Sequence, residues 1–200
     1  MTCKGWIASL CCLCLAVVLS GCPPLSEASK IRKTGVRMAR LEQGATQYKR
    51  EKYYFPGQAE TAILGGNPGQ LTGSQFLARV LFTPPNGKYP DDFPQSGYAE
   101  FKPDVLFTDG TRDNVISDGY PDPMPICYYP ARVTERGLKQ YVYEDNAVHT
   151  RGREGGEFYE FIRDANRLGE QPYKPDAFLL VAPGPDRRYF TDDDLTNWTR

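Results

Sequence analysis

Four aspartates near the C-terminus are the residues whose type and spacing point most clearly to chemistry. Asp186 is followed by the consecutive Asp192, Asp193 and Asp194, shortly after the apolar run 178–181. Clustered carboxylates repel one another unless a cation compensates them, and calcium takes about six to eight oxygen ligands, mostly from carboxylates and carbonyls. The cluster therefore predicts a calcium loop, although the residue spacing of an EF-hand is absent.

Two explanations without a metal fit the same residues. The segment 191–194 before Leu195 has the composition of a helix N-terminus, where a capping side chain and acidic residues are favourable. Arg187 and Arg188 would alternatively neutralise the carboxylates directly. The spacing alone leaves all three explanations open.

The second feature with chemical meaning is Cys22, which follows a segment typical of protein export. Lys4 is the only charge before the apolar run 6–19. As a helix this run would rise about 21 Å, which is short of the roughly 30 Å of hydrocarbon in a bilayer. Leu19-Ser20-Gly21-Cys22 resembles the bacterial lipobox, whose cysteine receives a diacylglycerol and becomes the first residue of the mature chain.

The expected organisation is a lipoprotein signal peptide at 1–21 and one domain over 22–200 with a short N-terminal tether. The lipid anchor on Cys22 would hold the protein at a membrane of the cell envelope, with the domain on the periplasmic or extracellular side. A plain cleaved signal peptide with an incidental cysteine is one alternative. A prepilin-type cleavage site at Lys4-Gly5-Trp6 is another, although Leu10 occupies the position where such sites carry glutamate.

Other nucleophiles and metal ligands are scarce in the mature chain. Cys127 lies in an apolar run between prolines, which predicts a buried free thiol rather than a nucleophile. His149 is the only histidine, and its polar neighbours predict a solvated loop residue. Zinc sites of the Cys/His type and the usual serine hydrolase triads are therefore not expected.

Composition excludes further classes of function. The chain has 24 Lys and Arg against 25 Asp and Glu, and no basic stripe stands apart from acids, so no nucleic acid partner is expected. With 40% hydrophobic and 12% aromatic residues, 200 residues can form one ordinary core.

The basic side of the predicted N-terminal helix is either a solvated face or a surface attracted to anionic lipid or a partner; it carries Lys30, Arg32, Lys33, Arg37, Arg40, Lys49 and Arg50.

Hydrophobic periodicity predicts an α+β fold, with a long N-terminal helix packed on a small antiparallel sheet. The long helix is expected over 26–52, with an apolar stripe formed by Ile31, Met38, Leu41, Ala45 and Tyr48. Shorter helices are expected over 74–82 and within 158–167. Strands are expected over 98–101, 105–108, 126–129, 140–143 and 178–182.

The C-terminal motif resembles the major pseudopilins of type II secretion systems. The residues that carry it are Gly184-Pro185-Asp186 and the run 191–198, Thr-Asp-Asp-Asp-Leu-Thr-Asn-Trp. The aromatic residues that end the long helix at 53–56 and the turn at 118–123 are similar to two further motifs of the family. The resemblance implies a calcium-binding loop in a pilin-like domain.

Carried over by position, the resemblance implicates as calcium ligands the side chains of Asp186, Asp192 and Asp194 and the backbone carbonyl of Leu180. Ala182 stands where the family often has a serine, and Arg187 and Arg188 replace glycine and a neutral residue. The lipobox with Pro23 and Pro24 replaces the continuous apolar N-terminal helix by which pseudopilins enter their filament.

These features predict a non-enzymatic, lipid-anchored, pseudopilin-like protein with a structural or partner-binding role. Its expected partners are the membrane and pilin-like or secretion-system proteins. The alternatives are an exported carbohydrate-binding module, suggested by 13 Tyr, and a glycan-active enzyme using a carboxylate pair such as Asp91 with Asp92 or Asp109 with Asp113.

Overall fold

The computed structural model is an α+β protein with small antiparallel sheets. Cys22, the predicted signal peptide and the pair Asp91 and Asp92 lie outside the described residues. The structure describes residues 25–59, 64–65, 69–82, 97–99, 103–110, 112–133, 139–167 and 171–199.

Helix α2 (Leu25–Lys52) occupies the position of the predicted long helix. It ends where Tyr53 takes a left-handed backbone with φ 70° and donates its N–H to the carbonyl of Lys49. Four residues of the predicted apolar stripe, Met38, Leu41, Ala45 and Tyr48, are buried, whereas Ile31 is only half-buried. None of the helices in the described ranges is both long and apolar enough to cross a membrane.

The largest sheet in the described residues has three antiparallel strands in the order β3-β6-β7. Its strands are β3 (Cys127–Pro130), β6 (Phe178–Ala182) and β7 (Leu195–Thr196). Tyr128 pairs with Leu180 in register, and Val181 pairs with Thr196. Two-stranded ladders join β1 (Leu106–Phe107) to β2 (Val115–Ile116) and β4 (Arg132–Val133) to β5 (Lys139–Gln140).

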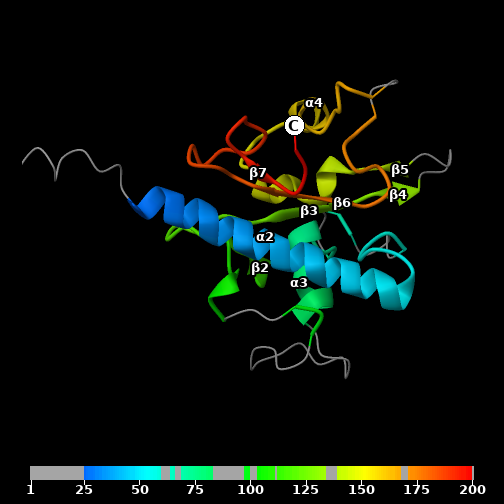
Figure 1. Ribbon diagram of the computed structural model, residues 1–200, viewed down its shortest axis with the longest axis horizontal. Helices are drawn as coiled ribbons and strands as arrows, with labels where there is room; N and C mark the ends of the chain where they lie inside the picture. Colours follow the sequence, from blue (N-terminus) through cyan, green and yellow to red (C-terminus); the bar gives the residue numbers. More distant parts are fainter. Residues whose placement is uncertain are drawn as a thin grey trace, which may run out of the picture.

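Strand β6 is buried on both faces, which explains its uninterrupted apolar sequence. Phe178, Leu180 and Ala182 lie in one core cluster, and Leu179 and Val181 lie in the other. The first cluster includes side chains of α2 and of α3 (Gly73–Phe82); these are Met38, Leu41, Ala45, Leu77, Ala78, Leu81 and Phe82. The second includes Phe158 of α4 (Gly155–Phe161), which lies on the side of the strands away from α3 (Figure 1).

Several elements differ from the sequence predictions. The segment 178–182 is confirmed as a strand, and the helix predicted over 74–82 begins one residue earlier. The strand predicted over 140–143 is wrong beyond its first residue, because β5 ends at Gln140 and Tyr143–Asp145 forms a 3-10 helix. The short helix expected within 158–167 begins earlier and ends at Phe161.

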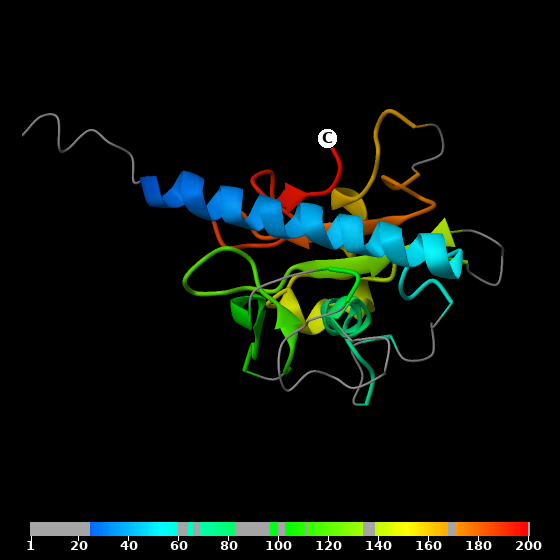
Figure 2. The same cartoon turned by 60° about the horizontal axis from the view of Figure 1, so that its bottom comes forward.

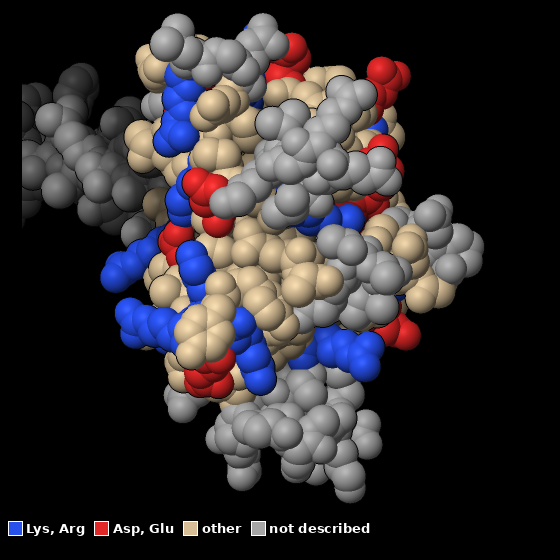
Figure 3. Space-filling view, turned by 90° about the vertical axis from the view of Figure 1, so that its right-hand side faces the viewer, with Lys and Arg blue, Asp and Glu red and all other residues tan. Residues whose placement is uncertain are grey.

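The surface mixes both signs of charge. On the face seen in Figure 3, Lys and Arg side chains are interspersed with Asp and Glu.

Figure 2, from another side, shows α2 extending along one side of the molecule with the C-terminal loop beside its first half. The protein therefore places the acidic C-terminal loop close to the N-terminal half of α2.

Candidate functional site

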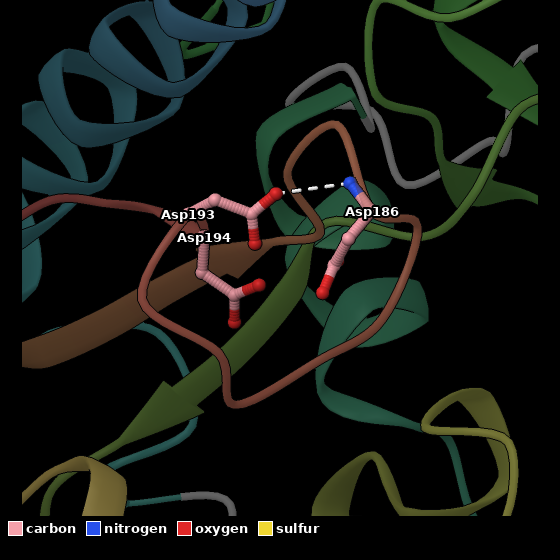
Figure 4. A group of neighbouring side chains, drawn as sticks. All are labelled: Asp186, Asp193 and Asp194. Carbon is pink, nitrogen blue, oxygen red and sulfur yellow. Dashed lines mark hydrogen bonds between the residues drawn. The ribbon is translucent and has the colours of Figure 1, made fainter.

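Three carboxylates meet in the loop that connects β6 to β7. Asp186, Asp193 and Asp194 each offer an oxygen, and these oxygens lie within 4.8 Å of one another. Figure 4 shows Asp186 on one side of the loop facing Asp193 and Asp194 on the other. Two oxygens bound to one calcium ion at about 2.3 to 2.6 Å can be up to about 5 Å apart, so the three carboxylates fit a shared ion.

Gly184 allows this loop to close. A side-chain Cβ at Gly184 would lie 2.1 Å from the backbone oxygen of Asp193, a distance that no other residue type tolerates without movement of the backbone. The carbonyl of Gly184 also accepts a hydrogen bond from the N–H of Arg187 at 3.1 Å, and Arg187 has a left-handed φ of 59°. The glycine therefore brings the segment containing Asp193 against the end of β6.

Hydrogen bonds orient the three carboxylates without engaging every oxygen lone pair. Asp193 accepts from the N–H of Asp186 at 2.9 Å, shown as a dashed line in Figure 4, and from the hydroxyl of Thr191 at 2.6 Å. Asp194 accepts from the N–H of Phe190 at 2.7 Å, and Asp186 accepts from the N–H of Arg188 at 2.8 Å. These hydrogen bonds fix the orientation of the three carboxylates within the loop.

The charge of Asp194 is costly in the protein alone. Burial raises the pKa of Asp194 to about 7, and the neighbouring Asp193 adds to the rise, while hydrogen bonds from Phe190 and Thr191 oppose it. The pKa of Asp193 is instead lowered, because hydrogen bonds from Thr191 and the backbone of Asp186 outweigh its desolvation. A cation in the loop would remove the cost of ionising Asp194.

The direct neutralisation by Arg187 that the sequence suggested is wrong. The Arg187 guanidinium bonds the carboxylate of Asp118 and the carbonyl of Asp122, and it lies 4.3 Å from the ring centroid of Tyr120. Among the described residues, no Lys or Arg forms a salt bridge with the three clustered carboxylates. The helix N-terminus explanation is also wrong, because Leu195–Thr196 forms strand β7.

The structure brings together two of the three side chains that the resemblance implicated and adds a third. Asp186 and Asp194 belong to the cluster, Asp193 completes it, and Asp192 is not one of the three. The carbonyl of Leu180 accepts a hydrogen bond from the N–H of Asn197 at 3.4 Å, within the pairing of β6 with the C-terminal segment. The consecutive aspartates were the only sequence signal for Asp193.

The prediction that His149 is solvated is wrong. Its side chain is buried, with Nδ1 at 2.5 Å from Asp109 and Nε2 at 2.8 Å from the hydroxyl of Thr72. Since a carboxylate only accepts, Nδ1 carries the proton and Nε2 accepts from Thr72. Burial lowers the pKa of His149 despite the nearby Asp109.

Thr72, His149 and Asp109 are hydrogen-bonded in the order hydroxyl, imidazole and carboxylate, as in a hydrolase triad, but the hydroxyl is not accessible to a substrate. Thr72 is fully buried, and its hydroxyl also accepts the N–H of Gln75 at 3.3 Å, in the first turn of α3. A nucleophile must reach its substrate, so we assign these residues to fixing the start of α3. Asp109, which was considered above in a carboxylate pair with Asp113, accepts the hydrogen bond from His149.

Cys127 is confirmed as a buried thiol. It is fully inaccessible in β3, and burial raises its pKa far above the usual value. A thiolate nucleophile is therefore not formed at this position.

Comparison with known proteins finds no matching family model, no matching curated protein and no matching solved structure. Functional assignment of this chain rests on its own geometry and motifs.

Proposed function

We propose that this protein is a non-enzymatic, lipid-anchored, pseudopilin-like module of the cell envelope that binds calcium in its C-terminal loop. Its role is structural or partner-binding, in a type II secretion or type IV pilus-like system. The observation that carries the proposal is the group of Asp186, Asp193 and Asp194, whose oxygens lie within 4.8 Å and which no described Lys or Arg neutralises.

A pilin-like arrangement, in which the long α2 packs on the small sheet, is part of this proposal. It is supported by the core that Met38, Leu41 and Ala45 of α2 share with Leu180 and Ala182 of β6. The acidic loop directly follows β6, so α2 and the loop are both connected to the same strand, α2 through the core and the loop through the chain. Ordering the loop would therefore stabilise the sheet whose core α2 shares.

Calcium would supply the positive charge that this loop lacks. Asp186, Asp193 and Asp194 would hold it, and the neighbouring Asp192 adds negative charge to the same loop. The ion would replace mutual repulsion with attraction and thereby order the connection between β6 and β7.

The lipid anchor would place α2 beside a bilayer. Cys22 precedes Leu25, the first residue of α2, by three positions, so the acylated residue lies within about 11 Å of the helix start even when fully extended. The proposed connection between the anchor and α2 is therefore short. The exposed side of α2, including Val36 at 47% exposure, would then face neighbouring envelope proteins.

A photo-crosslinking residue at Val36, introduced in the source cells, tests the assembly role. We expect adducts with a pilin-like protein, identified by mass spectrometry, because the exposed face of α2 is the contact surface in this proposal. The matched control is Tyr159 on α4, which is similarly exposed at 49% and lies elsewhere. Absence of a pilin-like adduct at Val36, or equal adducts at both positions, would contradict the proposed contact.

The alternative of a carbohydrate-binding module gains no specific support. The exposed large aromatic residues in the described ranges are Tyr53, after α2, and Tyr159, on α4. Sugar binding by stacking needs aromatic rings aligned along one surface, and these two lie on different elements.

A further inference from the structure

A basic pocket lies next to the three clustered carboxylates, and the loop that carries them supplies two of its arginines. It has a volume of about 540 Å³ and is lined by four arginines and two glutamates, namely Arg151, Arg153, Arg187, Arg188, Glu154 and Glu157. The arginines come from two segments far apart in sequence, the turn before α4 and the loop after β6. The pocket is within the size range of small-molecule sites, which is about 300 to 1,000 Å³.

Two of the four guanidiniums are already neutralised. Arg153 pairs with Glu157 at 2.7 Å, and Arg187 pairs with the buried carboxylate of Asp118. Arg151 and Arg188 form no salt bridge with any residue in the part of the chain that the structure describes. Arg188 contributes to lowering the pKa of Glu157, after the backbone of Glu154 and Arg153, which places its charge near α4.

Two of the arginines that line the pocket have a left-handed backbone. Arg151 has φ 50° and Arg187 has φ 59°, a left-handed conformation that favours glycine or asparagine. These are two of the six non-glycine residues with positive φ in the described chain.

We propose that this pocket binds a phosphate group, with Arg151 and Arg188 as the two arms that hold it. The pocket keeps a net positive charge after Glu154, Glu157 and Asp118 are counted against its four arginines, and planar guanidiniums bind phosphate oxygens in pairs. The pocket is larger than phosphate alone, so the remaining space accepts the moiety to which the phosphate is attached. That moiety belongs either to a soluble phosphorylated molecule or to a phosphorylated lipid headgroup.

Titration calorimetry of the full exported chain in nonionic detergent tests this assignment. The probes are pyrophosphate and short-chain phosphatidic acid, with short-chain phosphatidylcholine as the neutral control. We expect Arg188→Ala and Arg151→Gly each to weaken binding at least about tenfold. Arg50→Ala, which removes an exposed charge on α2, is expected to leave the affinity unchanged.

Arg151→Gly separates binding from folding. Glycine relieves the left-handed strain, so the melting temperature should stay the same or rise by roughly 1 to 3 °C while binding is lost. Binding of both phosphate probes indicates recognition of the phosphate itself, and binding of phosphatidic acid alone indicates a lipid headgroup site; either supports the proposal. No binding of either probe, wild-type affinity in Arg188→Ala, or equal loss in Arg50→Ala would overturn it.

Discussion

Cys22→Ser is expected to move the exported protein from the detergent-rich phase to the aqueous phase. Each buried CH₂ of an acyl chain contributes about 0.8 kcal/mol, and two or more chains give stable anchoring where one chain does not. Loss of the acylated cysteine removes that whole contribution.

Phase partitioning with a nonionic detergent, followed by immunoblotting, measures this change. Cys14→Ser is the matched control, because it alters a cysteine within the expected signal peptide and should leave partitioning unchanged. If wild type and Cys22→Ser were both aqueous after export, the protein would carry no lipid anchor and a plain signal peptide would be the better explanation.

Leu41→Ala should lower the free energy of unfolding by about 2 to 5 kcal/mol. Leu41 is 0% exposed and lies in the core that α2 shares with α3 and β6, so its truncation loses apolar burial and leaves a cavity. Chemical denaturation monitored by circular dichroism gives the value. Val36→Ala, on the exposed side of the same helix, should change stability by less than about 0.5 kcal/mol.

A loss in Leu41→Ala as small as that of Val36→Ala would mean that α2 does not contribute to the core. It would also remove the support that the shared core gives to a pilin-like arrangement.

Local patterns were enough to predict the elements that are buried along their length. The apolar run 178–182 marks the core because it is uninterrupted, as in a strand buried on both faces, and the stripe Met38, Leu41 and Ala45 marks it because it repeats at the period of a helix. Cys127 follows the same logic, since it lies within an apolar run. These predictions need no knowledge of what lies opposite each residue.

The errors arose where a residue's environment comes from distant sequence. His149 has polar neighbours along the chain, but Thr72 and Asp109 bury it and complete its hydrogen bonds. β7 has only two residues and exists because β6 offers an edge, so its sequence carries almost no strand signal. Short ladders of this kind are determined by the partner strand.

The same reason limits prediction of the candidate site. Consecutive aspartates cannot all point to one place, and the turn that closes through Gly184 selects Asp193 and Asp194 to face Asp186. Arg187 is next to Asp186 in sequence, but its side chain reaches Asp118. Composition predicted that the loop is acidic, whereas tertiary contacts decided which of its charges meet.

The raised pKa of Asp194 gives the calcium hypothesis a defined pH dependence. Without metal, burial raises the pKa of Asp194 to about 7 in the folded protein, above the ordinary value of about 3.8 that applies to the unfolded chain. This group therefore favours the folded state at low pH and loses that contribution as the pH rises through this window. Calcium binds the ionised form, so its stabilising effect should grow as the pH rises from 6 to 8.

Scanning calorimetry with calcium and with chelator, at pH 6 and pH 8, tests the calcium-loaded loop most directly. We expect calcium at about 100 times its dissociation constant to stabilise the fold by about 2.7 kcal/mol, with the larger rise in melting temperature at pH 8. Asp194→Asn should abolish the increment, and Glu160→Gln, an exposed acid on α4, should preserve it. Identical traces with calcium and with chelator at pH 8 would contradict the calcium site and, with it, the strongest support for a pseudopilin-like function.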